Sequence, residues 1–597
     1  MSSKVRGSVY SSSDKNVEII LEDTGNIEDI SIGRLVVIEG SSKLYLGVID
    51  SIEQRVYRGL ESYIPELSNG KFLNKYIEFL RDEASIKILK VIPVAEVDKN
   101  GSEVREVSSS PSIGSKIYGD QVNGIKMFYD SPDYRKSFPV GYAEDITGNH
   151  ILIPIPLDKL YNLSFGIFGK AGTGKTFLAN LLISYTVVYN TFVERDSDRI
   201  SLLIFDTQGE YSTSLLSDTG EPLCDGACRI FNDMFKLYSL DPSYRSDQGF
   251  TSLKIPLYDI DIDDFKTLTQ GLNLTKGFLD NLHFLKRKSE EVLDSFSKYT
   301  NGIFNRSLWV LPLLYDESDY GWMADILYRN GIIDLGDLDF DGLKSLLLDI
   351  YNGFMSKLSE ENVSKALLSA LNAGRRRLKT LLEYPISFKM EDYEVYSSIA
   401  SSLLNGDNVV INMGGRYGRN PNIYMAVANL IGRKLMDKVD GLATTSNNMG
   451  GRKIAIYLEE AHRFLGKEVS MTNPFGRIAR EYRKYGLIVI PIDQRPKELD
   501  PDVVAMLWGK FIFNLEDIRD ADIATTGLPM KNRFRDLVIR LPRGRLVFYS
   551  GLMRYPIVVK ALNVCSDKIE GGKSIYGYLS EKMDERRRLD DKTFDEP

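Results

Sequence analysis

The stretch from Gly169 to Thr176 holds the residues whose types and spacing point most clearly to chemistry, because it matches the pattern G-x-x-x-x-G-K-[ST]. Glycines at these positions let backbone N–H groups curl around a polyphosphate, and the positive end of a following helix adds to the attraction. Lys175 is placed to reach the β- and γ-phosphates, and Thr176 to offer a hydroxyl to Mg²⁺. An apolar, β-prone run, 163–168, precedes the stretch, and an apolar run at helical spacing, 177–188, follows it. This strand–loop–helix context predicts a site for ATP and Mg²⁺, and the residues expected around the nucleotide are Gly169, Lys170, Ala171, Gly172, Thr173, Gly174, Lys175, Thr176 and Phe177.

Two adjacent carboxylates, Glu459 and Glu460, follow the apolar run 454–458 and are candidates for a role in hydrolysis. Hydrolysis of a nucleoside triphosphate requires a metal ion and an oriented water molecule beside the γ-phosphate. We expect Glu459 to support Mg²⁺, directly or through water, and Glu460 to orient the attacking water. Aspartate is more usual than glutamate at the first of these positions.

Gln494 follows the next apolar run, 487–492, and is a further candidate. Its amide is expected to contact the γ-phosphate and to transmit the loss of this phosphate to neighbouring loops. Alternatively, Gln494 has only a structural role, in a turn before Pro496. Between the two runs lies a basic cluster on one predicted helix face, made up of Arg477, Arg480, Arg483 and Lys484. This cluster is either a solvated helix face or the source of an arginine, Arg480 or Arg483, that reaches the nucleotide of a neighbouring subunit.

These side chains are far apart in the chain, so a sheet must bring them together. Short apolar runs that end in polar residues are typical of parallel strands whose carboxyl ends form the site. Such runs occur at 200–205, 409–413, 454–458 and 487–492. The region between Ile260 and Leu382 has helical periodicity and predicts a helical insertion.

The first hundred residues predict a small β-barrel. Residues 33–49 indicate a strand, a turn and a second strand, and 86–97 indicate another strand pair around Pro93. Residues 60–82 are more helical and predict an insertion within the barrel. A Ser/Pro/Gly-rich stretch, 108–115, marks a boundary.

The expected fold class is therefore α/β, with a RecA-like P-loop ATPase core, an N-terminal small β-barrel and an inserted helical bundle. The expected domains are the barrel (1–105), a linker and entry to the motor (106–149), the first part of the core (150–256), the helical insertion (257–395), the second part of the core (396–560) and a C-terminal arm (561–597).

Composition limits the remaining possibilities. With 597 residues, 43% of them hydrophobic and 26% charged, the chain is typical of a multidomain globular protein. Its net charge of -8 does not indicate a polyanion partner, so any basic surface for nucleic acid must be local. No apolar run approaches the ~18 residues of a membrane span, and the amino terminus lacks a secretory pattern. We expect a cytoplasmic location and no membrane contact, with reduced thiols at Cys224, Cys228 and Cys565.

Five motifs resemble those of the HerA family of the HerA/FtsK ATPases, and they occur in the same order. They are Gly169–Thr176, Asp206-x-x-Gly209-Glu210-Tyr211, Leu458-Glu459-Glu460-Ala461-His462-Arg463-Phe464, Arg480-Glu481-x-Arg483-Lys484-Tyr485-Gly486 and Gln494-Arg495-Pro496. The resemblance covers nearly the whole chain. The Arg-His pair that the family usually carries before the first motor strand is replaced by Leu163-Ser164, so no role is transferred to that arginine.

The resemblance implies a homohexameric ring that translocates double-stranded DNA through a central pore with ATP, with a nuclease docked on the barrel face in DNA end processing. An alternative is the ATPase subunit of a prokaryotic antiviral defence complex, which scaffolds and regulates an effector such as a nuclease or a sirtuin-like protein. A third hypothesis is an assembly platform in which hydrolysis only gates the partner. The loops after Glu210 and between Phe464 and Arg477, including Lys467, are the expected DNA contacts.

Overall fold

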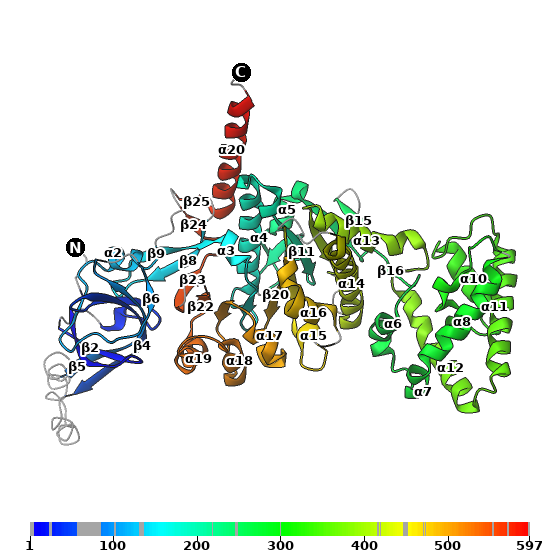
Figure 1. The fold of residues 1–597 in the computed structure, drawn as a ribbon, viewed down its shortest axis with the longest axis horizontal. Helices are drawn as coiled ribbons and strands as arrows, with labels where there is room; N and C mark the ends of the chain where they lie inside the picture. The colour runs from blue at the N-terminus through cyan, green and yellow to red at the C-terminus, as the bar shows by residue number, and fades with distance from the viewer. Residues whose placement is uncertain are drawn as a thin grey trace.

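The computed structural model describes residues 5–594 apart from 23–26, 57–84, 101–102, 130–136, 218, 245–248, 299, 415–416, 418–419, 446–451, 470, 472, 552–554 and 570–571. A small barrel, a central α/β motor and a helical bundle follow one another along the long axis of the molecule (Figure 1). This arrangement confirms the predicted fold class.

The amino-terminal barrel is a seven-stranded sheet in the order β2-β1-β7-β3-β4-β5-β6, closed by pairing of β2 with β5. Its strands are β1 (Gly7–Ser12), β2 (Val17–Leu21), β3 (Leu35–Glu39), β4 (Lys43–Val56), β5 (Ser85–Asp98), β6 (Arg105–Glu106) and β7 (Lys116–Ile117). The strand pair predicted around Pro93 is wrong, because β5 is one continuous strand. Pro93 lies beside a register shift with β4, where a residue without an N–H is tolerated. The helical insertion predicted at 60–82 lies outside the described residues.

The segment predicted as a linker contributes strands to two sheets. β7 pairs with β1 and β3, so the barrel sheet extends beyond residue 105. The short helix α2 (Gln121–Lys126) follows. β8 (Ser137–Glu144) and β9 (His150–Pro156) then form a hairpin that joins the motor sheet through β23 (Ile557–Ala561). The barrel and the motor are therefore connected by a strand pair that belongs to the motor sheet.

The motor is built on a twelve-stranded sheet in the order β15-β14-β18-β11-β19-β20-β10-β21-β22-β23-β8-β9. Its parallel strands are β10 (Phe165–Phe168), β11 (Ile200–Asp206), β14 (Phe235–Ser239), β15 (Phe250–Ser252), β18 (Asn408–Asn412), β19 (Lys453–Glu459), β20 (Leu487–Asp493) and β21 (Gly509–Phe513). β22 (Arg545–Ser550) pairs with β21 in the antiparallel sense. Every residue of β11, β18 and β20 is buried, which explains why these strands are mainly apolar.

Helices cover the sheet and connect its strands. The principal ones are α4 (Lys175–Phe192), α13 (Met390–Leu404), α14 (Pro421–Thr445) and α16 (Pro474–Glu481). Shorter elements of the motor are α3 (Leu157–Leu160), β12 (Ser214–Leu216), β13 (Pro222–Asp225), α5 (Ala227–Ile230), α15 (His462–Leu465), α17 (Pro501–Ala505), α18 (Ile518–Ala524) and α19 (Lys531–Arg540). After β24 (Lys568–Ile569) and β25 (Lys573–Ser574), the terminal helix α20 (Ile575–Phe594) contacts α4 and then projects away from the motor (Figure 1).

The helical bundle lies between two short strands that pair with each other in parallel, β16 (Ile255–Pro256) and β17 (Ile386–Ser387). Its helices are α6 (Ile262–Thr269), α7 (Lys276–Asp280), α8 (Leu282–Ser297), α9 (Leu311–Leu314), α10 (Tyr320–Arg329), α11 (Phe340–Glu360) and α12 (Lys365–Leu378). α11 buries apolar side chains at intervals of three or four residues, as a helix with one core-facing stripe does. The periodicity seen in the sequence is therefore that of amphipathic helices.

The expectation of three reduced thiols is wrong for two of them. Cys224, on β13, forms a disulfide with Cys565, and only Cys228 is a free cysteine, buried in α5. The bonded pair is 341 residues apart in the chain, so their spacing gave no signal of the contact. Within the described residues, the helices are all too short or too polar to cross a membrane.

Candidate nucleotide-binding site

The phosphate-binding loop connects β10 to α4, as the motif predicts. Gly172 and Gly174 adopt φ angles of 71° and 119°, which side-chain-bearing residues rarely adopt, so glycine is required for this path. The loop is anchored to the next strand by a hydrogen bond from the Lys170 N–H to the Asn514 carbonyl. Lys175 is the first residue of α4, and its side chain donates to the loop carbonyl oxygens of Gly169 and Lys170, at 2.7 and 2.9 Å. Burial lowers the pKa of Lys175, although neighbouring carboxylates oppose this.

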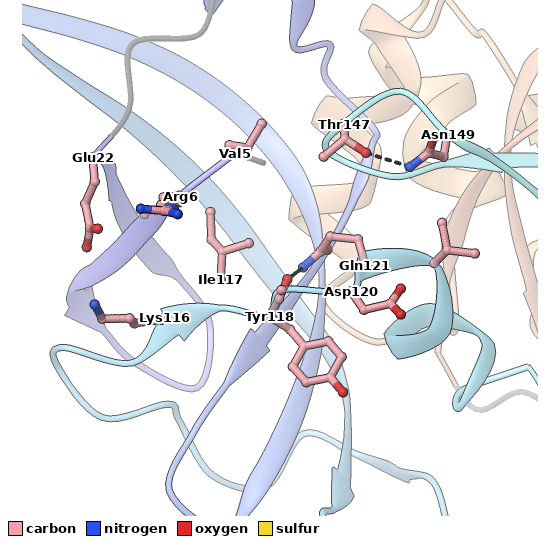
Figure 2. A pocket seen from close by; sticks show the side chains of 13 residues that line it. Val5, Arg6, Glu22, Lys116, Ile117, Tyr118, Asp120, Gln121, Thr147 and Asn149 are labelled. Carbon is pink, nitrogen blue, oxygen red and sulfur yellow. Dashed lines mark hydrogen bonds between the residues drawn. The ribbon is translucent and has the colours of Figure 1, made fainter. Parts of the chain in front are cut away.

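A cavity of about 360 Å³ lies over this loop and at the carboxyl ends of β19 and β20. It is lined by the loop, by the first turn of α4 and by all three predicted strand-end side chains, Glu459, Glu460 and Gln494. The lining residues of the loop and of α4 are Ala171, Gly172, Gly174, Lys175, Thr176 and Phe177. A larger cavity of about 610 Å³ lies at the barrel, beside β7 and the β8–β9 turn, with Arg6, Lys116 and Asp120 in its lining (Figure 2). Because the larger cavity contains none of the motif residues, we assign the nucleotide to the smaller one.

Glu459 is held by two hydroxyl groups from the loop after β11. Tyr211 donates to one of its carboxyl oxygens at 2.9 Å, and Thr207 donates to the other. Burial, with further contributions from Asp206 and Glu210, raises the pKa of Glu459 to about 7. In the protein without nucleotide, the environment therefore disfavours the charged carboxylate, which a nearby cation would favour.

Glu460 and Gln494 are in direct contact. The Gln494 side-chain amide donates to a Glu460 carboxyl oxygen at 2.7 Å. Glu460 has a φ of 49°, a conformation that costs free energy in a residue with a side chain and that is common at functional sites. The left-handed turn at the strand end directs this carboxylate into the cavity, which it lines together with Gln494.

His462 fixes the turn that follows Glu460. Its backbone N–H and its ring Nδ1 both contact the Asp493 carboxylate, at 2.7 and 2.9 Å. Burial lowers the pKa of His462, but the hydrogen bond and charge of Asp493 outweigh that effect, so the pKa is raised overall. Among the described residues there is no cluster of three or more His, Cys, Asp or Glu able to hold a metal ion alone.

Glu210 belongs to one of the sequence motifs without a predicted role at the nucleotide, and the structure places it in the cavity. Its carboxylate accepts a hydrogen bond from Thr176, and burial and the neighbouring Asp206 raise its pKa. Asp206 is fully buried and accepts hydrogen bonds from the N–H groups of Gly209, Tyr211 and Ser212, which shapes the loop that carries Glu210. Glu210 could have been predicted as a site residue from the sequence, because it lies just after the end of a predicted strand.

The residues present fit Mg²⁺ bound together with a nucleotide. This cation prefers oxygen ligands and usually retains water while binding one or two carboxylates and substrate phosphates. The Thr176 hydroxyl, Glu210 and Glu459 supply such oxygen donors around one cavity. Arg543, from the loop between α19 and β22, also lines the cavity, and no sequence pattern had singled it out.

The two candidate arginines have different surroundings. Arg480 lies on α16 and forms an ion pair with Asp500 of the same chain at 2.6 Å. Arg483 is exposed and lies beyond the end of α16, in a 3-10 turn formed by Tyr482–Tyr485. The basic cluster therefore does not form one face of one helix, because the α-helix ends at Glu481.

The raised pKa of Glu459 predicts a pH-dependent stability. Its ordinary pKa is 4.5, so between about pH 4.5 and 7 the folded protein binds a proton at Glu459 that the unfolded chain has lost. The free energy of unfolding should fall as the pH rises through this window, and Glu459→Gln should remove on the order of 1 kcal/mol of that fall. Urea unfolding of the nucleotide-free protein from pH 5 to 8 measures it. Glu481→Gln, at an exposed carboxylate, is the control; equal slopes in wild type and Glu459→Gln would contradict the assignment.

The fold and the cavity together define a P-loop ATPase with a RecA-like motor. Residues 139–435 match the family model described as the central domain of the helicase HerA. The chain belongs to the HerA family of the HerA/FtsK ATPases.

Relatives match this chain either locally or at low identity. The DNA double-strand break repair helicase HerA of Pyrococcus furiosus is 29% identical over 127 residues, which is 21% of this chain and 23% of that protein. The protein of the same name from Sulfolobus acidocaldarius is 31% identical over 121 residues, or 20% of this chain and 23% of its own length. These matches thus span less than a quarter of either relative. A probable helicase of Methanocaldococcus jannaschii is 21% identical over 553 residues, covering 90% of this chain and 87% of its own.

Solved structures align with this chain at still lower sequence identity. The bacterial conjugative coupling protein TrwB aligns with 71% of this chain and 90% of its own, at 13% identity and a TM-score of 0.42. VirB4 of Thermoanaerobacter pseudethanolicus aligns with 72% of this chain and 98% of its own, at 17% identity and a TM-score of 0.35.

Proposed function

We propose that this chain is an ATP-driven translocase of double-stranded DNA that works as a homohexameric ring, with Mg²⁺ as its metal. The observation that carries the proposal is the contact between Glu460 and Gln494 in the cavity that Lys175 also lines. A phosphate cradle, a candidate base for water and an amide that can respond to the γ-phosphate thus converge from three strands. This is the set of groups that a nucleotide-driven motor requires.

Each residue has a distinct part in the proposed hydrolysis. Thr176, Glu459 and Glu210 are the residues that would hold Mg²⁺, directly or through water, and the cation would neutralise charge on the phosphates of the nucleotide. Lys175 leaves the loop carbonyls and binds the phosphates. Glu460 orients the attacking water and accepts its proton, and Gln494 contacts the γ-phosphate. When the γ-phosphate leaves, Gln494 transmits the loss through its hydrogen bond to Glu460.

DNA contact requires a local basic surface, because the chain as a whole carries a net charge of -8. Lys467 is exposed in the loop between α15 and α16, beyond the carboxyl end of β19. We infer that this loop faces the pore of the ring and contacts DNA phosphates. Such contacts position the duplex without reading its sequence.

DNA should stimulate ATP hydrolysis, and its binding should weaken steeply as salt rises, independently of sequence. Lys467→Ala should weaken binding to all duplexes to a similar degree and reduce the salt dependence by about one phosphate contact per subunit. ATPase assays with duplex DNA and binding isotherms from 50 to 300 mM salt measure both effects. Lys276→Ala, at an exposed lysine of the helical bundle, is the matched control and should leave binding unchanged. Salt-insensitive or strictly sequence-specific binding would count against the proposal.

The same assay separates DNA end processing with a nuclease from the alternative role in antiviral defence. A translocase that works with a nuclease docked on the barrel hydrolyses ATP in response to DNA. A subunit that scaffolds and regulates a defence effector hydrolyses ATP in response to that partner, without DNA. Turnover that requires a co-purifying protein and ignores duplex DNA would therefore favour the alternative.

A further inference from the structure

The β12–β13 hairpin, which follows the loop that carries Glu210, has one buried face and one face in the nucleotide cavity. Leu215 on β12 pairs with Cys224 on β13; Leu215 is fully buried and Cys224 is bonded to Cys565. Neighbouring residues in a strand point to opposite faces. Leu216 and Leu223 accordingly lie on the other face, where both line the cavity and are 41% and 50% exposed.

The hairpin is a fixed element rather than a loose surface loop. The disulfide joins it to the segment after β23, across 341 residues of sequence. The Gly226 N–H, at its end, donates to the Thr213 carbonyl at 2.9 Å. The next N–H, that of Ala227, donates to the Asn180 side chain of α4 at 2.8 Å. Because α4 begins at the phosphate-binding loop, the hairpin is held at a set position relative to the phosphate cradle.

Two kinds of surface line the cavity, and they match the two parts of a nucleotide. The strand ends contribute carboxylates and amides, which suit a metal–triphosphate complex. The hairpin contributes two exposed leucines, and Phe177 in the first turn of α4 adds a third apolar side chain. Contact with a charged phosphate does not stabilise apolar side chains, whereas contact with a planar base removes their apolar surface from water.

Arg543 also lines this cavity, from the loop between α19 and β22. The Asn514 side chain binds the Leu541 carbonyl at 3.0 Å, and the Gly544 N–H donates to the Thr173 carbonyl at 3.2 Å. These contacts fasten the residues on either side of Arg543 to the phosphate-binding loop. They fix the backbone around Arg543 beside the loop, and an arginine guanidinium can stack on a planar ring.

We propose that Leu216 and Leu223, together with Phe177 and Arg543, form the subsite for the base of the bound nucleotide. This inference rests on the proposed nucleotide site, and it assigns the hairpin a direct role in holding the ligand. The base is held by apolar contact and stacking, while the triphosphate is held by the loop.

The double variant Leu216→Ser/Leu223→Ser tests the subsite with two ligands, ATP and inorganic tripolyphosphate, each with Mg²⁺. Loss of the apolar contacts should weaken ATP binding about tenfold. Binding of tripolyphosphate, which has no base, should not change. Isothermal titration calorimetry on the full-length protein measures both dissociation constants. Both leucines are exposed, so the thermal unfolding temperature should stay close to that of wild type.

Two control variants sharpen the result. Leu216→Met/Leu223→Met keeps the apolar surface and should retain wild-type affinity for ATP. Ile518→Ser, at an isoleucine that is 54% exposed at the start of α18, should not change the affinity for either ligand. Arg543→Ala should weaken ATP more than tripolyphosphate, because it removes stacking on the base.

Unchanged ATP affinity in the serine double variant would overturn the subsite. An equal loss for ATP and tripolyphosphate would overturn it as well, because the leucines would then shape the cradle and not contact the base. A failure of the proposed function would give a different result. Wild-type protein would then bind neither ATP nor tripolyphosphate, and Lys175→Ala would cause no loss of binding.

Discussion

Glu460→Gln is expected to bind ATP with nearly wild-type affinity and to hydrolyse it slower by on the order of 10² or more. Glutamine keeps the size of the side chain and can still accept the hydrogen bond from Gln494. It cannot accept a proton from water, so the chemical step loses its base while the phosphate cradle stays intact. Steady-state ATPase rates and ATP titrations, performed on the same preparation, separate these two effects.

Lys175→Ala provides the opposite pattern and serves as the control. It removes the cation expected at the β- and γ-phosphates, so ATP binding itself should weaken. Glu498→Gln, at a carboxylate that faces the same ring nitrogen of His462 as Glu460 does, should leave both binding and turnover close to wild type. A Glu460→Gln protein whose rate remains within a few-fold of wild type would remove Glu460 from the mechanism.

Mixed rings are expected to recover activity when Glu460→Gln subunits are combined with Arg483→Ala subunits, each inactive alone. Arg483 is exposed beyond the end of α16, so its guanidinium can reach the nucleotide of a neighbour, where a cation stabilises charge in the transition state. Some interfaces in a mixed ring join an intact glutamate to an intact arginine. ATPase rates across a series of mixing ratios, with hexamers confirmed by light scattering, measure the recovery.

The structure distinguishes the two arginines in this experiment. Arg480 already forms an ion pair with Asp500 of its own chain, so Arg480→Ala also breaks a contact between α16 and the start of α17. Arg477→Ala is the matched control, because Arg477 is an exposed arginine of α16 that pairs with nearby Glu481 at 3.7 Å. If no mixture regains activity although hexamers form, the essential arginine acts within its own subunit.

The parts of the site that the sequence predicted depend on local pattern. Glycines in a short loop and apolar runs that end in polar residues define a strand–loop–helix unit and the carboxyl ends of parallel strands. These features placed Lys175, Glu460 and Gln494, and the structure brings all three to one cavity. The periodicity of the bundle helices was similarly visible, because each helix has one buried stripe.

The parts that were missed depend on contacts between distant segments. Cys224 and Cys565 meet only because the hairpin and the segment after β23 lie together in the folded chain. Arg543 enters the cavity through hydrogen bonds that its neighbours make with Asn514 and the phosphate-binding loop. The partner of Arg480 was equally hidden, since an arginine-rich helix shows its charge in the sequence but not the acid that neutralises it.

The pairing of β16 with β17 has a consequence for how the chain folds. The bundle leaves and re-enters the motor at neighbouring positions, with Ile255 opposite Ile386. Strands β11 and β18, which pair on either side of this excursion, must therefore find each other across a long stretch of chain. Each doubling of a flexible loop adds only about 0.6 kcal/mol of closure entropy, so an excursion with adjacent ends is a small thermodynamic burden. The larger effect of the excursion is on the folding rate, because strands that are distant in the chain pair slowly. A bundle that folds early would bring the two halves of the motor sheet close to each other.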